Sequence, residues 1–192
     1  MDPTNREIDM PTAKAPDAVA LLKADHRKVE ELFEKFEGAR TASQKKSLAA
    51  EICTELTVHA TIEEEIFYPA CTGQIEEEDM VGEAYVEHDG AKVLIAELAE
   101  SDPDNEFYDA KMKVLSEDIK HHVKEEERRV DGLFAQAKEA GLDLDSLGER
   151  LMARKQQLLA QFKADGLPPP TTRAFTGHKL KQGKPVEAAA AG

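Results

Sequence analysis

Apolar side chains recur every three or four residues through most of the chain, which is the period of an amphipathic α-helix. No stretch alternates convincingly between apolar and polar positions, as a half-buried β-strand would. We therefore expect an all-α fold, an up-down-up-down four-helix bundle followed by an additional C-terminal helix. The expected helices run from Pro16 to Gly38, from Thr41 to about Gly73, from Glu76 to about Glu100, from about Pro103 to near Gly141, and from Asp143 to Lys163.

Local signals mark several of these boundaries. Thr41 and Gln44 have the spacing of a capping box, which begins a helix. The acidic run 76–79 suits a helix N-terminus, and the proline in 101–105 indicates a turn between helices. These signals divide the chain into a flexible N-terminal arm at 1–14, the bundle at 15–141, a C-terminal helix at 142–165 and a disordered, low-complexity tail at 166–192.

Composition and charge exclude several classes of protein. The chain has 25 Lys and Arg against 39 Asp and Glu, a formal net charge of −14. Such a surface repels phosphate backbones, so we expect no nucleic-acid partner. The longest apolar runs are about five residues, far from the ~20 of a membrane helix, and we expect a cytoplasmic protein with no membrane partner. We expect Cys53 to be a small core residue and Cys71 to be exposed.

Four of the six histidines fall one on each helix of the expected bundle, at His26, His59, His88 and His122. Each lies on the apolar stripe of its helix, so all four should point inward. At a rise of about 1.5 Å per residue, the distances from each histidine to the turns place all four within roughly 6 Å of one level. The sequence therefore predicts four imidazoles at one depth of the bundle interior.

Two of these histidines have a glutamate one helical turn later, at Glu63 and Glu126. Residues four apart share a helix face, so each pair presents an imidazole and a carboxylate to the same space. A lone inward histidine is usually a satisfied core residue, but a buried carboxylate without a partner costs several kcal/mol. We therefore predict a metal site formed by His26, His59, Glu63, His88, His122 and Glu126.

Six ligands could serve one ion, but two ions bridged by the carboxylates suit them better. Shared anions offset the repulsion between two cations roughly 3.5–4 Å apart. Imidazole and carboxylate ligands suit iron or manganese and can accept zinc. The Glu-x-x-His spacing of ferritin-like di-iron proteins is not met, and the His-Glu-x-x-His pattern of zinc proteases is absent.

Two other side chains are candidates for positions next to the ligands. His121 aligns with charged positions rather than with the apolar stripe, so we expect it to be exposed or to support the ligand set. Tyr85 lies one turn before His88 on the same stripe. It either fills the core or hydrogen-bonds a bound oxygen species.

The segments that carry these residues resemble the hemerythrin-like proteins with the His-His-Glu cation-binding domain. The resemblance covers about residues 16–141 and is carried by 25–33, 59–69, 87–89 and 121–127. Its most specific part begins at His59 and ends in a Tyr-Pro pair at Pro69. The resemblance implies a non-haem di-iron centre in a four-helix bundle, bridged by Glu63 and Glu126. Members of this family bind dioxygen, sense it, or handle nitric oxide or peroxide.

One position departs from the oxygen-carrying members, which have a further histidine where this chain has Lys92. Nearby cations disfavour a charged lysine, so we expect its long stem to carry the amine outward and leave one iron with an open position. We therefore expect a di-iron protein that binds dioxygen or a related small diatomic ligand. The alternatives are a stress-defence protein that handles peroxide or nitric oxide, and an iron store or carrier. The sequence does not separate these functions or indicate an oligomeric state.

Overall fold

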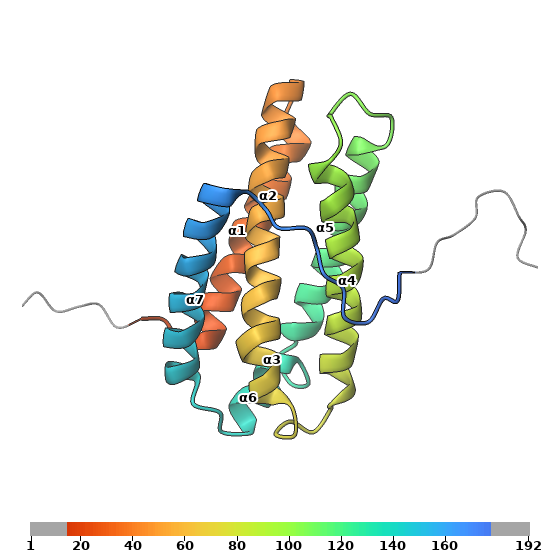
Figure 1. Ribbon diagram of the computed structural model, residues 1–192. Helices are drawn as coiled ribbons and strands as arrows, with labels where there is room; N and C mark the ends of the chain where they lie inside the picture. Colours follow the sequence, from red (N-terminus) through yellow and green to blue (C-terminus); the bar gives the residue numbers. More distant parts are fainter. Residues whose placement is uncertain (1–14, 178–192) are drawn as a thin grey trace, which may run out of the picture.

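The computed structural model describes residues 15–177, and within them every regular element is a helix. The bundle consists of α1 (Ala18–Gly38), α2 (Ala42–Ile62), α4 (Asp79–Ala99) and α5 (Tyr108–Glu126), which lie side by side in Figure 1. The prediction of an all-α bundle is confirmed. The expected N-terminal arm and the last part of the expected tail, 178–192, lie outside the described residues. No helix in the described part of the chain combines the length and apolar character needed to cross a membrane.

The second helix of the bundle does not stop at the end of α2. It continues through a π-helical turn, η1 (Glu63–Phe67), into the short helix α3 (Tyr68–Cys71). In this turn the Tyr68 N–H donates to the Glu63 carbonyl five residues back, instead of the usual four. In a regular α-helix these two residues would face about 140° apart. The wider turn accommodates one extra residue and brings Tyr68 onto the face that carries Glu63.

The predicted capping box at the start of α2 is confirmed. The Gln44 N–H donates to the Thr41 hydroxyl, and the Thr41 N–H donates to the Gln44 side-chain oxygen, each over 3.2 Å. The third helix of the bundle, α4, begins at Asp79 rather than at the expected Glu76. The reciprocal bonds at Thr41 satisfy two of the backbone donors that a helix N-terminus leaves unpaired.

The expected fourth helix is interrupted, so the prediction of one helix from about Pro103 to near Gly141 is wrong. The helix α5 ends at Glu126, and a separate short helix, α6 (Leu133–Glu139), follows. Between them the chain turns tightly at Gly132, where an added Cβ would lie 2.5 Å from the Arg128 carbonyl oxygen. Only glycine allows this close approach of two backbone segments.

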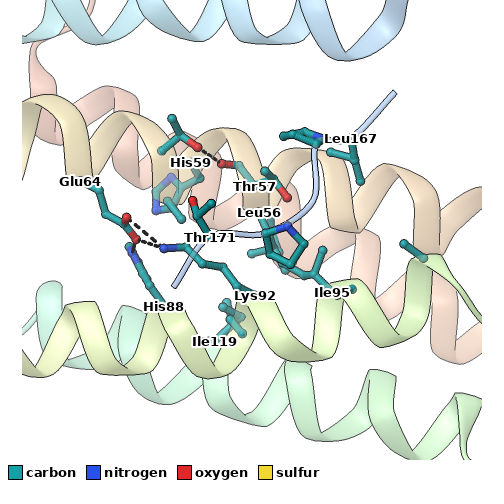
Figure 2. Close-up of a pocket in the computed structure, with 18 of the residues that line it drawn as sticks. Leu56, Thr57, His59, Glu64, His88, Lys92, Ile95, Ile119, Leu167 and Thr171 are labelled. Carbon is teal, nitrogen blue, oxygen red and sulfur yellow. Dashed lines mark hydrogen bonds and ion pairs between the residues drawn. The ribbon is translucent and has the colours of Figure 1, made fainter. Parts of the chain in front are cut away.

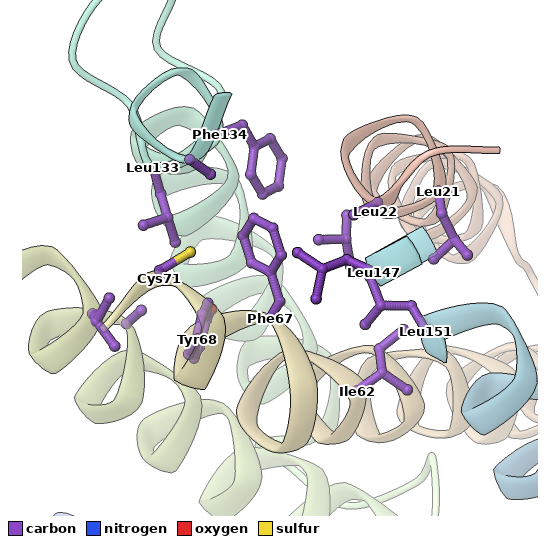
Figure 3. Packing of buried hydrophobic residues seen from close by; sticks show 14 of the residues in the cluster. Leu21, Leu22, Ile62, Phe67, Tyr68, Cys71, Leu133, Phe134, Leu147 and Leu151 are labelled. Atoms are coloured by element: carbon purple, nitrogen blue, oxygen red, sulfur yellow. The ribbon is translucent and has the colours of Figure 1, made fainter. Parts of the chain in front are cut away.

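The C-terminal helix α7 (Leu144–Asp165) packs against α1 and α2, as expected for a helix with one apolar face. Figure 3 shows Leu147 and Leu151 of α7 beside Leu22 of α1 and Ile62 of α2. All four side chains are buried. The helix therefore covers the outer side of the α1–α2 pair.

Buried apolar side chains form two clusters, one on each side of the histidine level. Along α2, for example, His59 stands between Leu56 of one cluster and Ile62 of the other. Cys53 lies in the same cluster as Leu56, as predicted. Cys71 is also completely buried, so the prediction that it is exposed is wrong. The reason is tertiary: α6 folds back beside α3 and covers it (Figure 3).

Residues 166–177 form no helix or strand, yet they cross the face of the bundle from the end of α7 to α4 (Figure 1). We call this segment the strap. Its backbone N–H groups at Arg173, Ala174 and Phe175 donate to Oδ2 of Asp89 over 2.5–3.1 Å. This part of the expected low-complexity tail is thus held by a buried carboxylate on α4, because that oxygen supplies an acceptor for three consecutive backbone donors.

Candidate metal centre

The four histidines at the predicted level lie in two pairs in the middle of the bundle. His26 of α1 and His59 of α2 form one pair, with 3.1 Å between their Nε2 atoms. His88 of α4 and His122 of α5 form the other, with 3.3 Å between their Nε2 atoms. All four rings are buried. We call these the α1/α2 pair and the α4/α5 pair.

Glu63 lies between the two pairs and has no exposed surface. Its Oε2 atom is 3.2 Å from His59 Nε2 and 3.4 Å from His88 Nε2, so it contacts one ring of each pair. Its other oxygen, Oε1, has no hydrogen-bond partner among the described residues. A buried carboxylate oxygen of this kind is strongly unfavourable unless a cation is near it.

Glu126 repeats this arrangement with the remaining ring of each pair. Its Oε2 atom is 3.4 Å from His26 Nε2 and 3.6 Å from His122 Nε2. That oxygen is also buried and without a hydrogen-bond partner among the described residues. The structure therefore brings all six predicted ligands together, with each carboxylate reaching from one histidine pair to the other.

Each histidine directs its Nδ1 atom away from the centre, toward a carboxylate. An imidazole whose Nδ1–H donates to a carboxylate keeps its lone pair on Nε2, which is the usual arrangement of a metal-binding histidine. Two Nε2 lone pairs facing each other have no hydrogen to share, so they require a cation or a proton between them. The Nδ1–oxygen distances are 2.8 Å for His26 and Glu127, 3.6 Å for His59 and Asp25, 3.0 Å for His88 and Glu64, and 2.8 Å for His122 and Glu87.

Without metal, protons have to supply the missing positive charge. Burial acts to lower the pKa of His59, but the carboxylates of Glu63 and Asp25 raise it to about 10. Burial also acts to lower the pKa of His88, and hydrogen bonds to Glu63 and Glu64 raise it to about 9. Burial would raise the pKa of Glu63, yet the facing His59 holds it well below its ordinary value. The metal-free centre thus favours charged groups despite its burial.

Tyr68 is a site residue that the sequence analysis did not identify. Its hydroxyl lies 3.0 Å from Glu126 Oε1, 3.3 Å from Glu63 Oε2 and 3.3 Å from His88 Nε2. Burial and the two carboxylates raise the pKa of Tyr68 well above its ordinary value, so it remains a hydrogen-bond donor. The Tyr-Pro pair in the sequence was the available signal, but only the π turn places this ring at the centre.

Tyr85, the tyrosine that the sequence did suggest, lies farther from the ligands. Its hydroxyl is 3.5 Å from the backbone oxygen of Glu64, and its ring packs edge-on against that of Tyr68. The guanidinium of Arg173 in the strap lies over the same ring, 4.1 Å from its centroid. Tyr85 therefore packs between the centre and the strap, and Tyr68 is the tyrosine whose hydroxyl faces the ligands.

Lys92 does not point at the ligand atoms. Its Nζ atom lies 2.8 Å from Glu64 Oε1 and 3.3 Å from Asp89 Oδ1, so it pairs with the carboxylate that holds His88 (Figure 2). His121 is exposed, and its Nε2 atom is 3.6 Å from Glu87. Both residues thus contact carboxylates that support a ligand rather than the site itself.

The ligand atoms form two overlapping groups. Within each group, no two ligand atoms are more than 4.8 Å apart. Both groups contain Glu63, as expected for a bridge between two cations. The unpartnered carboxylate oxygens and the inward Nε2 atoms fit cation binding. The first group is His26, His59, Glu63 and Glu126, and the second is Glu63, His88 and His122.

Comparisons with known proteins identify the family of this bundle. The model of the hemerythrin HHE cation-binding domain family matches residues 17–134. A hemerythrin HHE cation-binding domain-containing protein from Mycobacterium kansasii has a crystal structure that matches 79% of this chain and 95% of its own, with a TM-score of 0.64 and 21% identity. A DNA nickase from Nostoc sp. is 27% identical over 107 residues, which are 56% of this chain. These residues span only 30% of the nickase.

Proposed function

This chain belongs to the hemerythrin HHE cation-binding domain family, and we propose that it is a non-haem di-iron protein that binds dioxygen or a related small diatomic ligand. The observation that carries the proposal is the meeting of four inward Nε2 atoms and two unpartnered carboxylates in a buried space. Iron bound there would supply a redox-active Lewis acid for such a ligand. Manganese and zinc also suit this donor set.

Two ions, rather than one, are supported by the division of the ligands into two groups. His26 and His59 would hold one ion, and His88 and His122 the other. The family resemblance implies that both glutamates bridge, and Glu63 contacts one ring of each pair. The carboxylates at the Nδ1 atoms orient the rings, and the two apolar clusters exclude water above and below the centre.

The α4/α5 side is the better candidate for binding the diatomic ligand. Both glutamates lie slightly farther from this pair, at 3.4 and 3.6 Å, than from the α1/α2 pair, at 3.2 and 3.4 Å. The hydroxyl of Tyr68 lies 3.3 Å from His88 Nε2 on this side and can donate a hydrogen bond. Lys92 is held by Glu64 and Asp89 and leaves this side of the centre uncrowded.

Metal analysis of the iron-loaded protein tests the proposal directly. We expect two ions per chain, and we expect Glu63→Gln to lose at least one of them because the neutral amide bridges cations poorly. Glu65→Gln is a matched control, because Glu65 lies in the same turn but pairs with Arg154 outside the centre. One ion per chain, unaffected by Glu63→Gln, would contradict the di-iron proposal.

An optical spectrum of the reduced protein, recorded before and after exposure to air, tests the ligand. A reversible band that depends on dioxygen or nitric oxide supports a binding protein. The absence of any spectral response to either gas in a chain shown to hold two irons would rule out the diatomic ligand while leaving the metal site intact.

Peroxide handling is a second candidate function, and the position of Tyr68 favours it. A hydroxyl within 3.3 Å of both glutamates could donate a hydrogen bond to a peroxide held at the centre. We expect Tyr68→Phe to slow peroxide consumption by about 10²-fold, as the loss of one such donor to developing negative charge commonly does. Tyr85→Phe, which removes a hydroxyl from the neighbouring ring, should leave the rate unchanged.

We infer that nucleic acid is not a partner of this chain, although one relative is described as a DNA nickase. The formal net charge of −14 repels a phosphate backbone at long range. Because the chain spans less than a third of the nickase, the similarity does not locate the DNA-cleaving part of that protein in the shared region. We expect no binding to duplex DNA at physiological salt.

A further inference from the structure

A cavity of about 440 Å³ opens onto the metal centre, among α1, α2, α4 and α5 and beneath the strap. All four histidines of the centre line it, and Leu167 and Thr171 of the strap lie over it (Figure 2). A diatomic ligand needs little more room than a water molecule, which occupies about 30 Å³ in the liquid. Small-molecule sites in proteins commonly measure about 300–1,000 Å³. The cavity is therefore much larger than the proposed diatomic ligand requires.

The walls of this cavity are predominantly apolar. Three threonines also line it: Thr171 in the strap, and Thr57 and Thr61, whose hydroxyls are both used within α2. These two hydroxyls donate to the backbone oxygens of Cys53 and Thr57 over 2.7 and 2.6 Å, so they offer no free donor to a ligand. The apolar lining includes Leu56, Ala91, Ile95, Ala96, Ile119 and Leu167.

The charged groups that line the wall beside the histidines are already paired. Lys92 has two carboxylates within 3.3 Å, those of Glu64 and Asp89. Glu64 is paired in turn with His88. A charged ligand would have to break one of these pairs, whereas an uncharged ligand would leave them in place. The wall thus favours an uncharged occupant.

The strap closes the cavity and is held at a single buried point. Asp89 has no exposed surface, and one of its oxygens accepts the N–H groups of Arg173, Ala174 and Phe175. Next to the end of α7, Leu167 packs against both apolar clusters, and farther along the strap Arg173 stacks on Tyr85. A segment without helix or strand that is fastened at one site can open without unfolding the bundle.

We propose that this cavity binds an uncharged, predominantly apolar organic molecule next to the metal centre, with the strap as its lid and Asp89 as the residue that holds the lid closed. The inference rests on the proposed function only in taking the neighbouring site to be a di-iron centre. It enlarges the class of molecules that reach that centre from diatomic gases to organic compounds. The occupant would lie against Leu56 and Ile95 and would be covered by Leu167.

Binding of the uncharged fluorescent probe N-phenyl-1-naphthylamine to the full chain tests the cavity. We expect saturable binding that Ala96→Phe weakens at least tenfold, because the added ring fills part of the cavity. Ala110→Phe places the same ring on the exposed side of α5 and should bind the probe like the unmodified chain. No binding to the unmodified chain, or equal binding by the two variants, would overturn the proposal.

The lid is tested by the rate of probe association. We expect Asp89→Ala and Arg173→Ala to accelerate association at least fivefold, while Glu97→Ala, which removes an acid from the exposed side of α4, leaves it unchanged. Arg173 is exposed, so this variant should fold normally even if Asp89→Ala does not. Equal rates for Arg173→Ala and the unmodified chain would show that the strap is not a lid.

Metal content measured on the same samples separates the two proposals. Probe binding by a chain that takes up no iron would contradict the di-iron function and support the cavity. Two irons per chain together with no difference between Ala96→Phe and Ala110→Phe would support the di-iron function and contradict the cavity.

Discussion

The α1/α2 pair and the α4/α5 pair have nearly the same internal geometry, with Nε2 atoms 3.1 and 3.3 Å apart, but they differ in how completely they are surrounded. Both glutamates contact both pairs, but they lie nearer the first, at 3.2 and 3.4 Å, than the second, at 3.4 and 3.6 Å. Tyr68 approaches the second pair and not the first, through His88. The second pair is thus held slightly less closely by the carboxylates and has a hydrogen-bond donor beside it.

The supports behind the two pairs differ in the same way. Behind the α1/α2 pair, Asp25 is paired with Lys155 of α7, a regular helix packed on the bundle. Behind the α4/α5 pair, Lys92 links Glu64 to Asp89, and Asp89 holds the strap. A packed helix therefore supports the α1/α2 half, and a fastened loop supports the α4/α5 half.

Removing one histidine from each pair should give the largest difference between the two halves. Because both glutamates lie farther from the α4/α5 pair, we expect His88→Ala to lose one of the two ions. The glutamates lie closer to the α1/α2 pair, so His26→Ala should retain both ions with weaker binding. Metal per chain after equilibration against a weak chelator measures the difference. His121→Ala, an exposed histidine next to His122, is the control, and equal losses from both pairs would refute the asymmetry.

Removing the carboxylates behind the histidines should have a smaller effect that still differs between the halves. Glu64 lies 3.0 Å from His88 Nδ1, so we expect Glu64→Ala to weaken binding of one ion by about 10–100-fold. Asp25 lies 3.6 Å from His59 Nδ1, beyond a normal hydrogen bond, so Asp25→Ala should cost less. Competition titrations with a coloured chelator give both values. A larger loss from Asp25→Ala would show that the short distances are not what orients the rings.

The smallest expected difference between the two halves is in how the stability of the metal-free chain depends on pH. The pKa values of His88 and His59 are raised to about 9 and about 10, so the stability that these histidines contribute is fully present below their ordinary pKa of 6.5. It is lost as the pH rises through about 9 for His88 and about 10 for His59.

We therefore expect the midpoint of thermal unfolding of the chelator-treated chain to fall between pH 7 and pH 10, relative to that of His59→Gln. Histidine titrations followed by NMR should show the His88 ring losing its proton first. An unfolding temperature that rises over this range would contradict the assigned charge state. The iron-loaded chain is the control, because metal replaces the protons and removes this dependence.

The bundle and the meeting of the six predicted ligands could be inferred because they depend on short-range spacing. Apolar residues three and four apart define each inward stripe, and a glutamate four residues after His59 or His122 has to share the face of that histidine. The level of the histidines follows from helix rise and turn positions alone. None of these inferences requires knowledge of which helix packs against which.

The features that the sequence did not reveal depend on contacts between distant segments or on changes in helix type. The break before α6 leaves the spacing of apolar residues intact, so Gly132 was the one sequence signal for the end of α5. The burial of Cys71 depends on α6 folding back, and the path of the strap depends on Asp89, more than 80 residues earlier. The face occupied by Tyr68 could not be found by counting residues along a regular helix.

The π-helical turn at Glu63–Phe67 has a consequence for changes in chain length. Deleting one residue from a regular helix rotates everything beyond it by about 100°. Here a deletion between Glu63 and Tyr68 could be absorbed by converting the turn to ordinary α-helix, which would keep both side chains on one face. The helix can therefore lose one residue in this turn without moving Tyr68 off the face that carries Glu63. A tyrosine either four or five residues after the glutamate can thus lie on the same face. Alignment gaps between such chains belong inside this turn.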